Sequence, residues 1–280
     1  MPSPLVSIVI PTKNSAANLD ACLRTIDKQT HRAIEVIVVD GISTDATRHI
    51  ACAYGSRVLE FAPHLRPGVF DAPHKRNYGA RHACGDYVYF IDADMELDPT
   101  VVEDAVSLCE QGFDAVIVPE DSFGIGVWAQ AKQLERRCYM GDDRIEAPRF
   151  VRRAVWAAVG GLDETLQGGG DDWDFHATLR SRGFHVARTH SLVHHNEGRL
   201  SLSRLAAKRF MYGRDVLRYV SKRPRSAVAS YFPFRTGYFA HWRQFVSHPY
   251  LFVCFVVMRT TEYAAGAAGV MLSLLRREHR

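Results

Sequence analysis

The sequence lacks the cysteine pattern of a metal-binding or disulfide framework. Its six cysteines are scattered over 280 residues, and none forms a Cys-x-x-Cys pair. This excludes a zinc-finger or disulfide-stabilised small domain and indicates buried thiols in a reducing compartment. Low-complexity segments and internal repeats are also missing, while 47% of the residues are hydrophobic and 24% are charged. The chain is therefore expected to fold into a globular protein with a full core, not a disordered or fibrous one.

Long hydrophobic runs are also missing. Residues 1–14 have no basic region and no long apolar stretch before a predicted strand, so no secretion signal is expected. The two apolar stretches at 249–258 and 263–275 are each shorter than the roughly 20 residues that span a bilayer, and Arg259 and Glu262 interrupt them. We expect two helices that lie in a membrane interface. The alternative is that both pack on the core or form the interface of a homodimer.

Acidic residues are scarce after residue 198. That segment holds 15 of the 35 Lys and Arg residues but 3 of the 31 Asp and Glu residues, so the preceding part is net acidic by 8. A basic segment is typical of binding to nucleic acid or to an anionic membrane, although a solvated helical face is an alternative. It carries no groove-reading motif, so we expect no nucleic-acid partner. Together with the apolar stretches, it favours a peripheral location at the cytoplasmic face of the membrane.

Short apolar strands alternate with helices over the first 200 residues. Strands are predicted at 5–14, 34–43, 56–62, 86–94, 113–120 and 185–198, and helices at 19–30, 43–55, 75–85, 128–139 and within 163–183. The alternation predicts an α/β fold with a mostly parallel sheet flanked by helices. A long basic amphipathic helix is predicted at 201–224. We therefore expect a catalytic domain at 1–200 and a helical segment at 201–280.

Two aspartates follow one of these strands in the stretch FIDADMELDP, residues 90–99. An apolar run followed by Asp-x-Asp is typical of a buried strand that delivers carboxylates at its C-terminal end, where open α/β sheets bind ligands. Asp92 and Asp94 are therefore candidate ligands of a hard divalent cation. The alternative is a turn before a helix, in which Asp98 is the N-cap and Pro99 is the first helical residue.

Five motifs, in order, resemble those of the family-2 glycosyltransferases, inverting enzymes with the GT-A fold. They are IVIPTKN (8–14), VIVVDGISTD (36–45), KRNYGARHACGDYVYFIDAD (75–94), GGLDETLQGGGDDWDF (160–175) and HHNEG (194–198). The resemblance covers roughly residues 5–200 and implies transfer of a sugar from a nucleotide-sugar donor. Such a transfer needs Mg²⁺ or Mn²⁺, because a diphosphate leaves the anomeric carbon and the cation neutralises its charge.

The resemblance implies a set of binding residues. For the metal, it points to Asp94 and Asp92, with His195 favoured over His194 because strand alternation lets one of them face the site. For the nucleotide sugar, it points to Pro11, Thr12, Asn14, Asp40, Lys75, Arg76, Asp92 and Ala93. Structural alternatives stay open for each, such as a strand-end turn for Asp40 and a surface position for Arg76.

The acidic pair of the family falls on Asp171 and Asp172. By the family pattern Asp172 is the base that takes the proton of the acceptor, and Asp171 replaces the usual Glu. A helix N-terminus is also rich in acidic residues for electrostatic reasons alone. Trp173 is expected either as a wall of the sugar or acceptor pocket or as part of the core. Lys13 stands where many relatives carry an aromatic residue that stacks on the base, and this departure leaves the base open. By default, a UDP-sugar is expected first and a GDP-sugar second.

The sequence therefore predicts a metal-dependent inverting glycosyltransferase that moves a single sugar to a hydroxyl or phosphate acceptor. The Gln-x-x-Arg-Trp signature of processive synthases is missing, which favours single addition. The basic, apolar C-terminal segment suggests a lipid-linked acceptor. Two alternatives are a sugar-nucleotide pyrophosphorylase-like nucleotidyltransferase and a non-catalytic GT-A scaffold. The first is disfavoured because PTKNSAAN is not the expected Gly-rich, Arg-containing loop.

Overall fold

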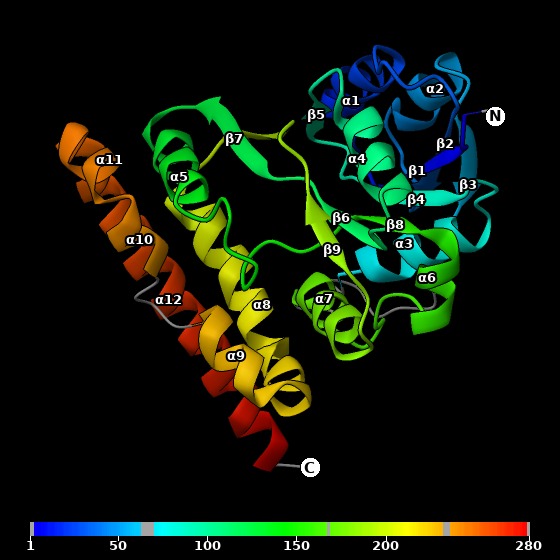
Figure 1. The fold of residues 1–280 in the computed structure, drawn as a ribbon. Coiled ribbons are helices and arrows are strands. Elements are labelled where there is room, and N and C mark those ends of the chain that lie inside the picture. The colour runs from blue at the N-terminus through cyan, green and yellow to red at the C-terminus, as the bar shows by residue number, and fades with distance from the viewer. Residues whose placement is uncertain (1–2, 63–69, 167–168, 232–235, 279–280) are drawn as a thin grey trace. The chain divides into compact units, whose positions relative to one another are not determined.

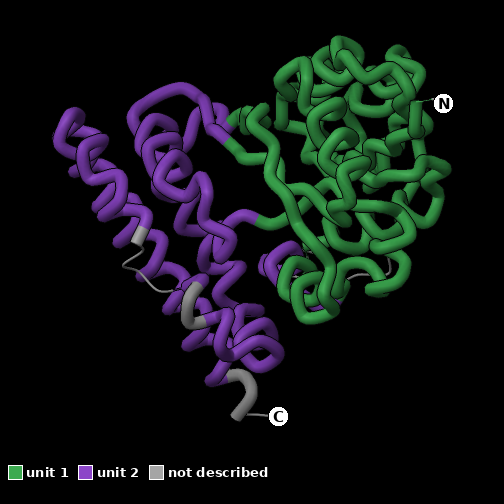
Figure 2. The backbone as a smooth tube through the Cα atoms, viewed as in Figure 1, with its two compact units in different colours: residues 1–120, 147–164, 175–196 green, residues 121–146, 165–174, 197–280 purple. Residues whose placement is uncertain are grey.

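The computed structural model describes residues 3–62, 70–166, 169–231 and 236–278. The chain divides into two compact units (Figure 2): unit 1 comprises residues 1–120, 147–164 and 175–196, and unit 2 comprises residues 121–146, 165–174 and 197–280. The expected boundary at residue 200 differs from this division. The reason is that two internal segments, 121–146 and 165–174, pack with the C-terminal helices, so that contacts and not chain order define the units.

Unit 1 is built on a seven-stranded sheet in the order β3-β2-β1-β4-β8-β6-β9. Its strands are β1 (Val6–Thr12), β2 (Ile34–Asp40), β3 (Arg57–Glu60), β4 (Tyr87–Phe90), β6 (Ala115–Ile117), β8 (Phe150–Arg152) and β9 (Val186–Arg188). The pairs β1·β2, β1·β4, β2·β3 and β6·β9 are parallel, whereas β8 is antiparallel to both β4 and β6. The predicted mostly parallel sheet is thus confirmed.

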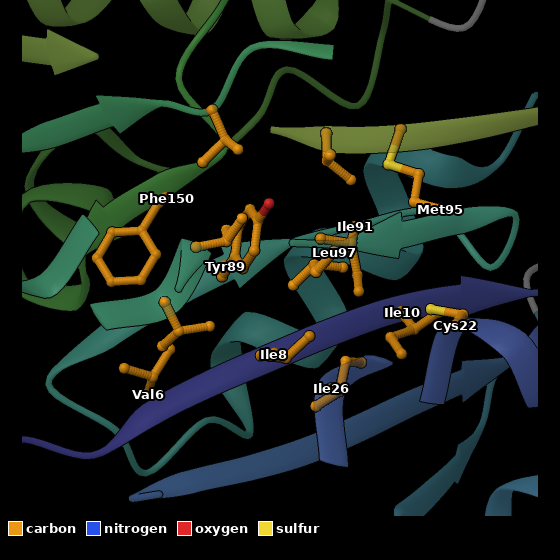
Figure 3. Packing of buried hydrophobic residues seen from close by; sticks show 14 of the residues in the cluster. Val6, Ile8, Ile10, Cys22, Ile26, Tyr89, Ile91, Met95, Leu97 and Phe150 are labelled. Atoms are coloured by element: carbon orange, nitrogen blue, oxygen red, sulfur yellow. The ribbon is translucent and has the colours of Figure 1, made fainter. Parts of the chain in front are cut away.

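Alternate residues of β1 enter two separate cores, because successive side chains of a strand point to opposite faces. Ile8 and Ile10 pack with α1 (Ala16–Asp27) and α4 (Val101–Glu110), and Figure 3 shows this cluster with Cys22, Tyr89 and Met95. Val9 instead packs with α3 (Ala72–Arg81) and α6 (Arg153–Val159) on the other face (Figure 1). The strands are therefore apolar on both faces, as a buried parallel sheet requires.

Helix α3 lies very close to the sheet at Gly79. A Cβ atom there would come within 2.4 Å of Val9 Cγ1 and 2.9 Å of Val39 Cγ2. Glycine therefore allows the helix to approach β1 and β2. The helix carries Lys75 and Arg76, so this contact also sets how far these two predicted site residues lie from the sheet.

The structure does not have the alternative helix start at Asp98, and it divides the strand predicted at 185–198. The N-cap of α4 is Thr100 and not Asp98. Asp98 instead accepts hydrogen bonds from the backbone N–H of Leu192 and from His194 Nε2, both at 2.9 Å. The single strand expected at 185–198 is two strands, β9 and β10 (Val193–Arg199), because a turn closed by Thr189 separates them. β10 pairs in antiparallel fashion with β5 (Met95–Leu97), in a small sheet of order β5-β10-β7, where β7 is Glu120–Ile125.

Unit 2 is mainly helical. Its helices are α5 (Val127–Arg137), α8 (Leu202–Lys222), α9 (Pro224–Tyr231), α10 (Thr236–Ala240), α11 (Trp242–Ser247) and α12 (Pro249–Glu278), to which the first turn of α7 (Asp171–Ser181) is added. Helix α2 (Thr47–Ala53) belongs to unit 1. Helix α12 packs along α8 so closely that a Cβ at Gly269 would lie 2.2 Å from the carbonyl oxygen of Phe210.

The expected two short C-terminal helices are wrong, because α12 is one continuous helix of 30 residues. Its polar interruptions, Arg259 and Glu262, are tolerated because they are paired: Arg259 is partly buried, and its Nη1 lies 2.9 Å from Glu135 and 2.6 Å from the buried Glu262. Among the described helices, α12 alone is long and apolar enough to cross a membrane, over Pro249–Leu275, by length and composition.

Candidate active site

The site is built at the carboxyl ends of the central parallel strands. Thr12 ends β1 and Asp40 ends β2, and the two residues are paired in register. Asp92 follows β4, which pairs with the other side of β1. Because parallel strands deliver their carboxyl ends to one edge of the sheet, these residues lie along the same edge, where α/β proteins bind ligands.

Asp40 is completely buried and fully hydrogen-bonded. It accepts hydrogen bonds from Thr12 Oγ1 at 3.2 Å, from the backbone and hydroxyl of Ser43 at 2.9 and 2.5 Å, and from Arg48 Nε at 2.8 Å. Burial by itself would raise the pKa of Asp40, but the hydrogen bonds from Ser43 and Arg48 outweigh it and lower this pKa. Asp40 thus fixes the shape of the strand-end turn, and its contact with the nucleotide stays a prediction.

The turns after β1 and β2 lock each other in place. The backbone N–H of Asn14 donates to Ser43 Oγ, and Asn14 Oδ1 accepts from the backbone N–H of Thr44, both at 2.8 Å. Asn14 and Ile42 both have positive φ, at 51° and 58°. Asparagine adopts this region readily, whereas a β-branched isoleucine is strained there. The predicted nucleotide residues Pro11, Thr12 and Asn14 are thereby held as one rigid edge.

Lys75 and Arg76 are adjacent in α3 but have different partners. Lys75 Nζ donates to the carbonyl of Thr12 at 3.0 Å and pairs with Asp71 at 2.9 Å, so it supports the end of β1 from a buried position. Arg76 Nη2 lies 2.7 Å from Asp92 Oδ1. Arg76 therefore belongs to the acidic motif, while a contact between Lys75 and the nucleotide stays a prediction.

A second guanidinium, which sequence reasoning missed, lies on the other oxygen of Asp92. Arg149 Nη1 is 3.1 Å from Asp92 Oδ2, and its Nη2 is 3.3 Å from Glu120 Oε1. Burial would raise the pKa of Asp92, but the charges of Arg76 and Arg149 outweigh it and hold this pKa far below its usual range. No sequence motif indicates Arg149, because it precedes a short strand that is distant from Asp92 in the chain.

Asp94 lies beside His195, as the family pattern implied. His195 Nε2 is 3.3 Å from Asp94 Oδ2, whereas the neighbouring His194 faces Asp98. The other ring nitrogen of His195, Nδ1, is 3.8 Å from Glu120 Oε2. Ala93, between the two aspartates, is buried. One charged network within unit 1 therefore links six side chains, namely Arg76, Asp92, Arg149, Glu120, His195 and Asp94.

Asp94 and His195 are the residues that would hold a divalent cation, and this assignment stays a prediction. In the described part of the chain, no three His, Cys, Asp or Glu side chains are grouped as a complete metal site. A carboxylate and an imidazole are nevertheless enough for Mg²⁺ or Mn²⁺, which keep positions for substrate phosphates and water. Asp92 as a direct ligand stays a prediction, and it would require one guanidinium to leave.

The acidic pair lies at the start of α7, within unit 2. Asp171 is buried and Asp172 is partly buried, and the neighbouring Asp174 pairs with Lys222 at 2.8 Å and Arg223 at 2.7 Å. Of the two expectations for Trp173, the contacts favour the core. Its Nε1 donates to the carbonyl of Ile145 at 2.7 Å, and its ring packs on Tyr219 and Tyr231.

Comparison with known proteins identifies the class. The family model described as "Glycosyl transferase family 2" matches residues 7–162. A PGL/p-HBAD biosynthesis glycosyltransferase of Mycobacterium bovis is 32% identical over 198 residues, covering 67% of this chain and 74% of that protein. An uncharacterized glycosyltransferase of Escherichia coli, YibD, is 34% identical over 159 residues, covering 55% and 43%.

Solved structures share the fold at low identity. The mannosyltransferase PcManGT of Pyrobaculum calidifontis, in complex with GDP-Man and Mn²⁺, matches with a TM-score of 0.59 and 20% identity, over 99% of this chain and 79% of that one. Residues 1–349 of S. aureus TarS with UDP-GlcNAc match with a TM-score of 0.57 and 15% identity, over 99% and 92%. Against a longer TarS chain the match spans 76% of this chain and 40% of that one.

The chain belongs to glycosyl transferase family 2 and has the GT-A fold. It is accordingly an enzyme of glycosyl transfer.

Proposed function

We propose that the protein is a metal-dependent, inverting glycosyltransferase that moves one sugar from a nucleoside-diphosphate sugar to a hydroxyl or phosphate acceptor. The observation that carries the proposal is the charged edge of the sheet. Asp94 and His195 lie 3.3 Å apart there, next to Asp92 and its two guanidinium groups. A carboxylate and an imidazole are suitable ligands for the cation, and the neighbouring arginine side chains suit the diphosphate that the cation accompanies.

The divalent cation, Mn²⁺ or Mg²⁺, would be held by Asp94 and His195, and when bound it neutralises the charge on the diphosphate leaving group. Asp92, already ionised by Arg76 and Arg149, keeps this part of the site from carrying excess positive charge. The ordered turn around Asn14 and Asp40 would receive the nucleoside. PcManGT and TarS support a nucleotide-sugar donor, since they are described with GDP-Man and with UDP-GlcNAc. UDP stays our first expectation and GDP our second.

Inversion requires a base on the face of the sugar opposite the leaving group. We assign this role to Asp172, with Asp171 next to it, on the family pattern. The carboxylate of Asp172 would take the proton of the acceptor hydroxyl as its oxygen attacks the anomeric carbon. The carbon–oxygen bond to the diphosphate breaks at the same time, and the product has the opposite anomeric configuration.

The acceptor is proposed to be lipid-linked and the enzyme to work at the cytoplasmic membrane surface. Helices α11 and α12 expose apolar side chains, and Trp242, Val246, Tyr250, Val253 and Met271 are each more than half exposed. Exposed apolar side chains in a segment that holds 15 Lys and Arg residues and 3 Asp and Glu residues suit an anionic lipid interface. Arg259 and Glu262 do not oppose this, because their charges are paired inside unit 2.

The donor test is thermal stabilisation of the native protein by UDP, GDP, ADP, CMP and dTDP, each with and without Mn²⁺. A nucleotide at 100 times its Kd stabilises by about 2.7 kcal/mol. We expect one nucleotide to shift Tm in the presence of Mn²⁺, the shift to vanish in Asp94→Ala, and the shift to persist in Glu110→Ala, which removes an exposed carboxylate from the same unit. No shift with any nucleotide, or an equal shift without Mn²⁺, would contradict the proposal.

The membrane test is co-sedimentation with vesicles of anionic or of zwitterionic lipid. Deletion of 249–280 is unsuitable, because α12 contributes Cys254, Phe255 and Met258 to the core of unit 2. We instead expect Tyr250→Ser with Val253→Ser to reduce binding to anionic vesicles. The matched control is Ile125→Ser, which removes an equally exposed apolar side chain from β7. Equal binding of native protein and both variants would refute the proposed surface.

A further inference from the structure

Glu120 is a charged residue to which the proposed mechanism gives no role, although it lies within the site and pairs with Arg149. Glu120 begins β7 and Arg149 directly precedes β8, and both belong to unit 1. Their side chains are 14% and 20% exposed. A partly buried charged pair is weak support for stability, since desolvation offsets much of the attraction. Its position therefore calls for a functional reason.

The two oxygens of Glu120 have different partners. Oε1 lies 3.3 Å from Arg149 Nη2, and Oε2 lies 3.8 Å from His195 Nδ1. The guanidinium of Arg149 is divided in the same way, because its other terminal nitrogen lies 3.1 Å from Asp92. Arg149 is thus fixed at two points, and it holds the carboxylate of Glu120 on the Nδ1 side of the imidazole.

The opposite side of the same imidazole faces the proposed cation ligand. His195 Nε2 is 3.3 Å from Asp94 Oδ2, so the ring lies between two carboxylates, one at each nitrogen. A histidine that binds a metal through one nitrogen commonly donates its other N–H to a carboxylate, which sets the tautomer and the ring orientation. The distance of 3.8 Å is longer than a direct hydrogen bond, and a bridging water completes contacts of this length.

We propose that Glu120, held in place by Arg149, is a positioning residue for His195. It accepts the Nδ1 proton of the imidazole, directly or through one water, so that the lone pair of Nε2 is directed toward the cation beside Asp94. The inference rests on the proposed metal-dependent function and deepens it, because it names the side chain that controls the affinity for the cation. Glu120 itself touches neither the cation nor the donor.

The first test is a double-mutant cycle on Mn²⁺ affinity, measured from the electron paramagnetic resonance signal of free Mn²⁺ with no nucleotide present. Removal of such an outer carboxylate typically weakens metal binding by about 10- to 100-fold. We expect this loss for Glu120→Gln in the native background and less than about a threefold loss in the His195→Asn background. Glu110→Gln, an exposed carboxylate, is the matched control and should bind as the native protein does.

The second test is the tautomer of His195, read from its side-chain ¹⁵N shifts in a long-range NMR spectrum and assigned by the loss of its signals in His195→Asn. The native ring should carry its proton on Nδ1, and Glu120→Gln should shift the population toward Nε2–H or mix the two. The spectrum is recorded with diamagnetic Mg²⁺ and UDP present, because without a cation the carboxylate of Asp94, 3.3 Å from Nε2, competes with Glu120 for the ring proton. A change that merely loosened the fold would not select a tautomer.

The outcomes separate the inference from the function on which it rests. If Glu120→Gln leaves both Mn²⁺ affinity and tautomer unchanged, or loses equal affinity with and without His195, the positioning role is wrong. If the native protein binds no Mn²⁺ either alone or with UDP or GDP, but shows the Nδ1–H tautomer that Glu120→Gln abolishes, the contact is confirmed and the metal dependence fails. Should Glu120→Gln fold poorly, Glu120→Asp retains the charge but shortens the reach to His195, and the same cycle applies.

Discussion

Loss of one charge from the ionic cluster of unit 2 should destabilise the protein strongly. Glu135 in α5 is 1% exposed, and it pairs with Arg259 at 2.9 Å and with Lys132 at 2.8 Å. Glu262 completes the cluster through Arg259 and through Arg209 at 3.0 Å. In Glu135→Gln, three cations would share one carboxylate. Breaking a buried pair from one side costs about 3–5 kcal/mol, which is a large part of the roughly 5–15 kcal/mol that stabilises a typical protein.

The glutamine keeps the size and part of the hydrogen bonding of Glu135, so we expect the lower end, about 3 kcal/mol. For a protein of this size that corresponds to a fall in Tm of roughly 6–12 °C. Calorimetry and urea titration would measure it, with the fluorescence of Trp128, which packs against the same helices, as a local reporter. The double variant Glu135→Leu with Arg259→Leu keeps the net charge of the cluster and should recover most of the loss.

Acid titration tests the same reasoning independently. Burial would raise the pKa of Glu135, but Arg259 and Lys132 outweigh it and lower this pKa in the folded state. A lowered folded pKa means that the carboxylate contributes stability above its unfolded pKa of about 4.3 and loses this contribution as the pH falls toward the folded value. The Tm gap between native protein and Glu135→Gln should therefore narrow below about pH 4. A Tm gap that does not change with pH would refute the account. A difference in the free energy of unfolding under about 1 kcal/mol at pH 7 would refute it as well.

Three further outcomes are expected. Gly269→Ala should lower the free energy of unfolding by about 1–3 kcal/mol, because the new Cβ would lie 2.2 Å from the carbonyl oxygen of Phe210. Gly266→Ala should instead raise Tm, because the nearest atom to its Cβ is 3.9 Å away. Equal effects of the two variants in thermal unfolding would contradict this packing. Ile42→Asn should raise stability by about 1 kcal/mol, since asparagine tolerates positive φ; an unchanged or lower Tm would show that the loop is not strained. Asp172→Asn should reduce kcat by about 10²- to 10⁴-fold with little change in donor KM; near-native kcat in steady-state kinetics would remove Asp172 from the base role.

Much of unit 1 could be predicted because its signals are local. Buried strands are continuous apolar runs, so β1, β2 and β4 are visible in the chain, and parallel strands must bring Thr12, Asp40 and Asp92 to one edge. The alternation of strand residues likewise predicted that one of the two histidines faces the acidic motif, and His195 is beside Asp94.

Other features depend on partners that are distant in sequence. Asp98 and Pro99 have the local pattern of a helix start, but His194 and Leu192, nearly a hundred residues away, engage the Asp98 carboxylate instead. Arg259 and Glu262 interrupt the C-terminal apolar segment in the sequence, but one helix accommodates both. Glu135 of α5 pairs with Arg259, and Arg209 of α8 pairs with Glu262. Local propensity does not include such partners.

Apolar periodicity and the order of short motifs were enough to predict the fold class, the family and the edge of the sheet where the acidic motif lies. The contacts of Arg149 and Arg76 with the two oxygens of Asp92, and the position of Glu120 next to His195 Nδ1, became visible in the folded protein alone. The same holds for the continuity of α12. The physical reason is that a charge buried among distant segments is stabilised by whichever side chains the fold brings within a few ångströms, and a linear pattern carries no record of that proximity.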